Sequence, residues 1–312
     1  MNWLISLKKE LSLIRFQVTR QTRIQQQIYR EILVKDRWNK GCAFPSAFEK
    51  QTFSQNGEDG IIDYLLSSLK IEKPKFIEIG VGDYSESNTR FFFERTSAEG
   101  LIIDIIDDFE KKVKENIKFW KGNLKILKEN INTENIQDTL KNNNFFNDID
   151  LLSIDIDGID YWVLKEIPKN FSKIIVVEFN PYFGDKLKIT VPNIKDFNRT
   201  NYHYSNLCFG ASLPALIDLL KTKGMEFVGT NLFRNNAFFV NNKFIELLSL
   251  EKVDVSDLKL HVNANFRESR NIDGSMSYID PKNVLNQLKD CKIIFLSNSI
   301  NEEKKIIDLI SE

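Results

Sequence analysis

The sequence is poor in residues that bind soft metals or form covalent cross-links. Its 312 residues include only two histidines, His203 and His261, and three cysteines, Cys42, Cys208 and Cys291. Two histidines are too few for His-rich metal chemistry. The cysteines are odd in number, widely spaced and without a Cys-x-x-Cys pair, which argues against a disulfide framework and against a structural zinc site. This cysteine usage is typical of a protein in a reducing compartment.

The sequence also lacks an excess of charge and a long apolar run. Lysine and arginine together number 43, aspartate and glutamate 44, and the formal net charge is -1. Such a chain has no global basic field to attract nucleic acid, so we expect no nucleic-acid partner. No stretch approaches the roughly 18 apolar residues of a membrane span, and Lys8, Lys9 and Glu10 interrupt the N-terminal apolar stretch too early for a signal peptide. We therefore expect a cytoplasmic protein.

Residues 1–45 form a basic arm with helical periodicity. Leu4, Leu7, Leu11 and Ile14 recur at spacings of three and four, which predicts one apolar stripe on a helix. Two roles stay open for this amphipathic helix. It can pack on its own domain or pair with another copy of the chain, or it can attach peripherally to an anionic membrane surface.

Strand-like and helix-like segments alternate from residue 75 onward. The short apolar runs "KFIEIG", "GLIIDII", "DLLSIDID" and "KIIVVEFN" are separated by segments with helical character. This alternation predicts an α/β fold with a mostly parallel, doubly wound sheet and helices on both faces. The last two strands, in "MEFVGTN" and "NAFFVNN", have no helix between them and predict an antiparallel closing hairpin.

We divide the chain into three parts on this basis. The arm covers residues 1–45, and a Rossmann-like domain covers 46–250. This domain includes an irregular insertion over 181–210. Residues 251–312 are expected to add a C-terminal helical extension.

The loop after the first strand has the features of a nucleotide-binding turn. In "EIGVGDYSESN", Gly80 and Gly82 allow a tight turn and the close approach of a ligand, and the following helix offers free N–H groups. The second strand ends at Asp104, where a carboxylate can accept both hydroxyls of an adenosine ribose. Ligands of open α/β sheets bind at this end of the strands. We therefore predict a cofactor site made by Glu78, Gly80, Gly82, Asp83 and Asp104.

Two cofactors share this layout, a dinucleotide and S-adenosylmethionine. The dinucleotide fingerprint G-x-G-x-x-G requires a third glycine where this sequence has Ser85, and Asp83 and Glu86 would oppose the charge of a pyrophosphate. S-adenosylmethionine has no phosphate, and acids such as Glu78 and Asp83 favour its sulfonium and ammonium groups. An antiparallel closing hairpin also fits a methyltransferase sheet better than an all-parallel dinucleotide sheet. The sequence therefore favours S-adenosylmethionine, with NAD as the alternative.

Carboxylates gather after the fourth strand, in "LLSIDIDGIDYWVLKEI". In an extended segment Asp155 and Asp157 project to the same side, and two carboxylates about 4 Å apart repel by roughly 4 kcal/mol at an effective dielectric constant near 20. Such a pair holds a proton or meets a cation. The fifth strand ends in "EFN", which brings Glu178 and Asn180 to the same rim. These oxygen donors suit Mg²⁺, so Asp155, Asp157, Glu178 and Asn180 are candidate metal ligands.

Two versions of the chemistry stay open at this rim. A metal would bind the acceptor hydroxyl, lower its pKa and align it with a sulfonium methyl group. Without a metal, Asp155, Asp157 or His203 acts as the general base. His203 lies in the insertion, which is expected to overhang the active site. Asp160, next to Gly158 at the start of a helix, is expected to serve the helix N-terminus.

Several of these segments together resemble a known family. "SQNGEDGII", "FIEIGVGDYSESNTR", "LLSIDIDGIDYWVLKEI" and "IVVEFN" are similar to the FkbM-like branch of class I S-adenosylmethionine-dependent methyltransferases, and "FGASLPALIDLLKTKG", "NAFFV" and "FRESR" resemble a poorly characterised subgroup of it. The resemblance covers residues 50–280. It implies a Rossmann-like class I methyltransferase fold and O-methylation, often of sugars or other small hydroxylated metabolites. Asp83-Tyr84 departs from a simple glycine fingerprint.

The sequence thus predicts an S-adenosylmethionine-dependent O-methyltransferase. The expected acceptor is a sugar or glycan precursor, such as one used in polysaccharide biosynthesis, which rests on the resemblance alone. Two rival classes remain. An NAD-dependent oxidoreductase would have to accommodate a pyrophosphate beside Asp83, and a non-catalytic protein of the same fold would bind a cofactor or glycan without turnover. In "SQNGED", Ser54 or Gln55 either contacts the cofactor or caps the helix that follows.

Overall fold

The computed structural model describes residues 45–117, 122–248, 253–258, 269–297 and 301–310, together with seven isolated positions (3, 10, 11, 14, 21, 28 and 260). The arm predicted over residues 1–45 therefore lies almost entirely outside the described residues, as do Cys42, His261 and most of "FRESR". In the part of the chain that is described, no helix has the length and apolar character required to cross a bilayer.

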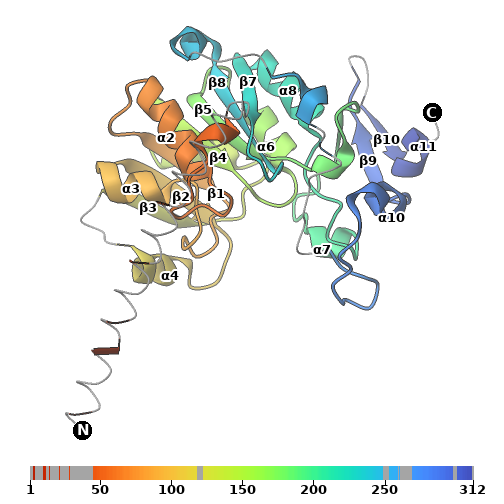
Figure 1. Ribbon diagram of the computed structural model, residues 1–312, viewed down its shortest axis with the longest axis horizontal. Helices are drawn as coiled ribbons and strands as arrows, with labels where there is room; N and C mark the ends of the chain where they lie inside the picture. The colour runs from red at the N-terminus through yellow and green to blue at the C-terminus, as the bar shows by residue number, and fades with distance from the viewer. Residues whose placement is uncertain are drawn as a thin grey trace.

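A seven-stranded sheet with the order β3-β2-β1-β4-β5-β8-β7 forms the centre of the molecule (Figure 1). The five strands β1 to β5 are parallel, and β8 runs antiparallel to both β5 and β7. The predicted α/β architecture with an antiparallel closing hairpin is therefore confirmed. The strands are β1 (Lys75–Ile79), β2 (Glu99–Asp104), β3 (Asn123–Lys128), β4 (Ile149–Ile154), β5 (Ser172–Glu178), β7 (Met225–Thr230) and β8 (Asn236–Asn241).

Helices cover both faces of this sheet because its central strands are apolar on both sides. On β1, Phe76 packs into one core and the next residue, Ile77, packs into the other, as the alternation of side chains along a strand requires. The Phe76 face is covered by α2 (Glu58–Ser68), α3 (Arg90–Thr96) and α4 (Phe109–Asn116). The Ile77 face is covered by α5 (Ile136–Asn142), α6 (Asp160–Glu166) and α8 (Leu213–Thr222).

A second, three-stranded sheet lies beyond the closing hairpin, in the order β10-β9-β6 (Figure 1). The strand β6 (Ile189–Thr190) belongs to the insertion, whereas β9 (Lys292–Phe295) and β10 (Glu302–Lys305) belong to the C-terminal extension. The extension thus contains two strands besides its short helices, whereas the sequence predicted a helical extension without strands named in it. Short helices complete this unit: α7 (Arg199–Tyr202), α10 (Val284–Gln287) and α11 (Ile306–Ile310).

The insertion and the extension share a third hydrophobic core. Ile189 and Leu207 of the insertion pack in one cluster with Leu288 and Ile293 of the extension, and all four are buried. Cys208 and Cys291 are also buried in this cluster as free thiols. Residues that are far apart in the sequence therefore form one structural unit next to the main sheet. The remaining short elements are the 3₁₀ turns Ser46–Phe48, Pro181–Phe183, Asn242–Leu247, Val255–Leu258 and Pro281–Asn283.

Candidate functional site

The carboxyl ends of β1 and β4 are in tight backbone contact at Gly80. Its φ is +83°, and a Cβ atom added there would lie 1.6 Å from the carbonyl oxygen of Asp155. The N–H of Asp155 also donates to the carbonyl of Ile79 at 3.0 Å. Only glycine allows this approach and this backbone conformation together. The glycine turn predicted from the sequence therefore lies directly against the segment that carries the carboxylates.

Two cavities meet at this contact and share Gly80, Gly82 and Asp155 in their linings. The first, which we call the apolar cavity, has a volume of about 380 Å³. Isoleucines provide much of its wall, and polar groups from the ends of β2, β3 and β4 lie at its edge. Its other lining residues are Ile79, Ile103, Asp104, Ile105, Ile106, Glu129, Asn130, Ile131, Ile156, Asp157, Ile159, Lys195 and Phe197.

The second, which we call the acidic cavity, has a volume of about 290 Å³. Five of its lining residues carry a carboxylate, and no lysine or arginine occurs among the described residues that line it. A cavity with this lining attracts cations and repels phosphate groups. Its lining residues other than the shared three are Gln55, Glu58, Glu78, Val81, Asp83, Ser85, Glu86, Ser87, Asn88 and Asn236.

Asp104 organises the glycine turn in addition to lining the apolar cavity. One carboxylate oxygen accepts the N–H groups of Val81 at 2.9 Å and Gly82 at 2.7 Å. The other accepts the N–H groups of Ile105 and Ile106. Because an ionised carboxylate has about four acceptor sites, a ribose hydroxyl bound here would share or replace one of these bonds.

Glu78 and Asp83 fix the segment that follows the glycine turn. The buried carboxylate of Glu78 accepts the N–H of Asn88 at 2.8 Å and the hydroxyl of Ser87 at 2.6 Å, while its burial raises its pKa. Asp83 is partly exposed, and the hydrogen bonds that it accepts from the hydroxyl and N–H of Ser85 lower its pKa. Both residues line the acidic cavity, at the predicted cofactor position.

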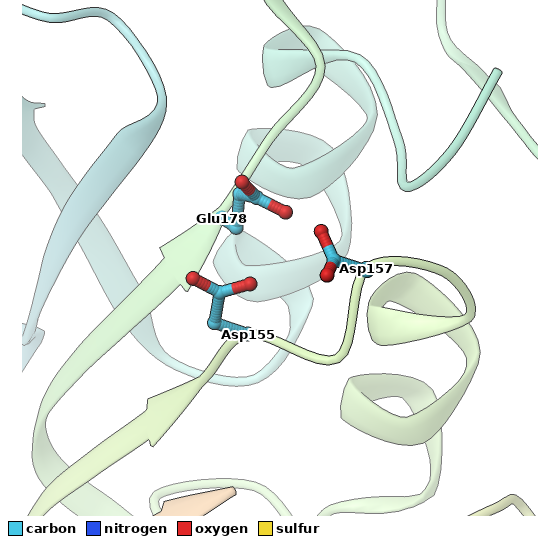
Figure 2. Close-up of side chains that lie close together, drawn as sticks. All are labelled: Asp155, Asp157 and Glu178. Carbon is cyan, nitrogen blue, oxygen red and sulfur yellow. The ribbon is translucent and has the colours of Figure 1, made fainter. Parts of the chain in front are cut away.

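Three carboxylates converge at the ends of β4 and β5 (Figure 2). Asp155 follows β4, Asp157 lies on the loop toward α6, and Glu178 is the last residue of β5. One oxygen of each lies within 4.8 Å of the others. Burial, and then the neighbouring carboxylates, raise the pKa of both Asp155 and Glu178 well above the ordinary range. The two side chains are hydrogen-bonded to each other.

An arginine from the insertion contacts this group. The guanidinium of Arg199 forms an ion pair of 2.6 Å with Asp157, and it lies over the ring of Phe209 at 5.6 Å. Arg199 is the first residue of α7, and its side chain is only 17% exposed. The insertion therefore reaches the carboxylates, as predicted, through a residue that the sequence did not single out.

No protein-family model and no curated protein matches the chain. Among solved structures, an S-adenosylmethionine-dependent methyltransferase from Clostridium acetobutylicum shares 8% identity over 59% of this chain and 90% of its own, with a TM-score of 0.36. PKMT2 from Rickettsia typhi in complex with AdoHcy shares 12% identity over 83% of this chain and 66% of its own, with a TM-score of 0.40. A putative RNA methyltransferase from Pyrococcus horikoshii shares 11% identity over 59% and 82%, with a TM-score of 0.35.

Structural similarity at these identities and TM-scores supports no statement about activity. The strand order of this chain defines its fold directly. The strand pairing gives a mostly parallel sheet with an antiparallel closing hairpin, so the predicted Rossmann-like methyltransferase fold class is confirmed. The assignment of individual residues rests on their contacts.

Asn180 does not join the carboxylates, although the sequence suggested it as a ligand. Its side chain is fully buried and donates to the carbonyls of Leu207 and Phe209 at 2.9 and 3.0 Å, while its Oδ1 accepts the N–H of Tyr182 at 3.0 Å. Its role is to fasten the insertion to the end of β5.

The contacts of His203 also differ from those expected of a general base. Its Nδ1 lies 2.7 Å from the hydroxyl of Ser205, and its ring packs on Tyr204 with a centroid distance of 4.3 Å. The imidazole is also hydrogen-bonded to the thiol of Cys291. His203 lines neither of the two cavities. It belongs to the unit that the insertion forms with the extension.

Asp160 is the first residue of α6, but no side-chain hydrogen bond caps this helix, which differs from the role expected for Asp160 at the helix N-terminus. Its carboxylate accepts the N–H groups of Ile156 at 2.9 Å and Gly158 at 3.0 Å, just before α6.

In the segment before α2, Ser54 is hydrogen-bonded to Asp59. The Oδ2 atom of Asp59 accepts the N–H and the hydroxyl of Ser54. Of the two residues considered there, Gln55 is the one that lines the acidic cavity.

The sequence reasoning missed Asn236, which lines the acidic cavity. It is the first residue of β8 and pairs with Glu178 on β5. The sequence did contain information about the position of Asn236, because a closing strand that runs antiparallel to β5 must start where β5 ends. Position 236 could therefore have been placed beside the carboxylates from the predicted hairpin.

Proposed function

We propose that this protein transfers a methyl group from S-adenosylmethionine to an oxygen of a small hydroxylated acceptor, a sugar or glycan precursor, in the manner implied by its resemblance to the FkbM-like branch. The observation that carries the proposal is the acidic cavity next to the glycine turn. Its five carboxylates and the absence of basic residues from its described lining suit a cationic ligand.

The residues of the two cavities fit S-adenosylmethionine better than NAD. The isoleucines and Asp104 of the apolar cavity suit an adenosine, and the acids of the second cavity suit an ammonium and a sulfonium group. A pyrophosphate in that place would face Asp83 and Glu86, and each pair of like charges about 4 Å apart costs roughly 4 kcal/mol at an effective dielectric constant near 20. The oxidoreductase alternative is therefore disfavoured.

Bound S-adenosylmethionine supplies a methyl group on a positively charged sulfur, which leaves as a neutral thioether. The residues of the chain supply the general base and position the reacting groups. Asp155 lines both cavities and belongs to the carboxylate group, so it lies beside the expected position of the sulfonium. Because its pKa is raised, it is a better acceptor for a hydroxyl proton than an ordinary aspartate. Arg199 keeps Asp157 oriented beside it.

A polyhydroxylated acceptor suits the oxygen-rich rim of the site. Asp155, Asp157 and Glu178 present only acceptor atoms when ionised, and an occupant with several hydroxyl donors would satisfy them. A sugar meets this requirement, which supports the acceptor class implied by the family resemblance.

Thermal unfolding with S-adenosylmethionine, with its demethylated product and with NAD tests the cofactor. At a hundred times its dissociation constant a ligand stabilises by about 2.7 kcal/mol, so the first two should raise the melting temperature and NAD should not. Stabilisation by NAD alone would overturn the proposal.

Transfer of a labelled methyl group to sugar nucleotides distinguishes an enzyme from a binding protein, and Asp155→Asn should abolish the transfer.

We propose a cytoplasmic location on the basis of cysteine usage. For the arm of residues 1–45, pairing with another copy and contact with an anionic membrane remain the two proposals. Sedimentation with and without anionic vesicles separates them, because only the second predicts cosedimentation that salt reverses.

A further inference from the structure

Two buried oxygen atoms at the carboxylate group have no hydrogen-bond partner among the described residues. They are Oε2 of Glu178 and Oδ1 of Asn236, whose residues are only 6% and 5% exposed. Glu178 and Asn236 face each other in the β5–β8 register, which puts their Cβ atoms about 5 Å apart. An unpaired buried acceptor is unfavourable, so this place is built for an occupant that brings positive charge or donors.

The orientation of the Asn236 amide is determined by its other contact. Its Nδ2 donates to the carboxylate of Glu58 at 3.0 Å, and Glu58 is itself buried and also bonded to Asn231. Turning the amide over would bring Oδ1 against the Glu58 carboxylate and lose this bond. The oxygen of Asn236 is therefore held away from Glu58, in a wall that also contains Asp155.

The charge of the group matches a divalent cation. Asp155, Asp157 and Glu178 carry three negative charges when ionised, and Arg199 neutralises one of them. Two negative charges remain, surrounded by oxygen donors and without a histidine or cysteine among the described neighbours. This donor set selects hard cations that prefer oxygen ligands.

We propose that a divalent cation, Mg²⁺ or Mn²⁺, binds between Asp155, Glu178 and Asn236, with the carboxylate of Asp157 at its edge. The amide ligand is Asn236 of β8 and not Asn180. The cation pairs with both orphaned oxygens. The site deepens the proposed function and rests on it for its purpose, since a bound cation would lower the pKa of an acceptor hydroxyl. Cation binding itself does not depend on that activity.

Electron paramagnetic resonance of Mn²⁺, titrated into the full chain without cofactor, measures the site directly because the signal of free Mn²⁺ is lost on binding. We expect one Mn²⁺ per chain, displaced by Mg²⁺. Asn236→Ala and Asp155→Asn should each weaken binding at least tenfold. Asn147→Ala, at an exposed position before the other end of β4, is the matched control and should bind like the wild type.

Arg199→Gln should strengthen Mn²⁺ binding, whereas Asn236→Ala and Asp155→Asn should weaken it. Removing the guanidinium takes a competing positive charge away from Asp157, so Mn²⁺ should bind several-fold more tightly. A variant that merely folds poorly cannot produce this gain. The proposal is overturned if the wild type has no stoichiometric site, if Asn236→Ala with an unchanged melting temperature binds Mn²⁺ like the wild type, or if Arg199→Gln weakens binding.

A separate titration with S-adenosylmethionine keeps the two proposals apart. Mn²⁺ binding without S-adenosylmethionine binding would leave the cation site standing and remove the proposed function. The reverse result would leave a metal-free methyltransferase with Asp155 as its base.

Discussion

Gly80 and Gly82 are two residues apart and both have positive φ, yet their surroundings differ. A Cβ atom at Gly80 would overlap the carbonyl of Asp155, whereas one at Gly82 would meet nothing within 4 Å. We expect Gly80→Ala to lower the free energy of unfolding by about 3 kcal/mol, because the ends of β1 and β4 must separate. Gly82→Ala, with only its backbone conformation to oppose it, should cost about 1 kcal/mol. Urea denaturation of both variants measures this difference, and equal losses would contradict the steric account.

Asp59 is the residue that most directly connects stability to pH. Burial raises its pKa from the usual 3.8 to about 7, even though its Oδ2 accepts the N–H groups of Thr52, Phe53 and Ser54. The folded state therefore binds a proton that the unfolded state releases near pH 4. This stabilisation is complete below that pH and is lost as the pH rises toward 7, a change of about 4 kcal/mol.

Asp59→Asn provides the test, because it cannot titrate. Its amide oxygen can accept the same N–H groups, and its amide nitrogen would occupy the place of Oδ1, which has no partner among the described residues. The stability of the variant relative to the wild type should rise steadily between pH 4 and 7 in urea denaturation. A difference that stays constant across this range would show that Asp59 is ionised in the folded protein.

The carboxylates were predictable from the sequence, and their amide neighbour was not. Asp155 and Asp157 follow an apolar run, and Glu178 ends the next one, so the parallel strands alone bring them together. Asn180 lies two residues past Glu178, but the chain turns there and uses its side chain to bind Leu207 and Phe209. Direction changes after a strand depend on tertiary contacts that a pattern of residue types does not contain.

Ser212, the N-cap of α8, ties two elements together. Its hydroxyl accepts the N–H of Ala215 in the helix and of Ile189 in β6, and it donates to the carbonyl of Leu187 at 2.6 Å. We expect Ser212→Ala to cost about 2 kcal/mol, because it removes a helix cap and leaves buried groups unpaired. Ser212→Thr keeps the hydroxyl and should cost much less. Similar losses for both substitutions in urea denaturation would show that packing, and not the hydroxyl, matters here.

The strands of the main sheet are easier to predict from the sequence than those of the second sheet. Strands such as β4 and β5 are six or seven residues long and almost wholly buried, which leaves continuous apolar runs. The strand β6 has only two residues, Ile189 and Thr190, and its partner β9 lies in the C-terminal extension. Such a short strand has no periodicity to detect, and its pairing depends on a contact between distant parts of the chain.

The shared core of the insertion and the extension makes a prediction about the whole molecule. Leu288 of the extension is fully buried against Ile189 and Leu207 of the insertion. Leu288→Ala should cost about 3 kcal/mol. Amide hydrogen exchange should quicken in β6 as well as in β9, while β1 stays protected.

Leu247→Ala, at a position that is 57% exposed, is the control and should change none of these rates. Faster exchange confined to β9 after Leu288→Ala would mean that the insertion and the extension are stabilised independently.

Biosynthesis gives this shared core a further consequence. A ribosome makes residues 181–210 well before β9 and α10, and domains generally fold from the N-terminus as the chain emerges. The seven-stranded sheet can therefore form while the apolar side chains of the insertion still await their partners. A nascent or prematurely terminated chain exposes that surface to chaperones and proteases, so emergence of α10 and β9 from the ribosome becomes the step that completes the surroundings of the carboxylate group.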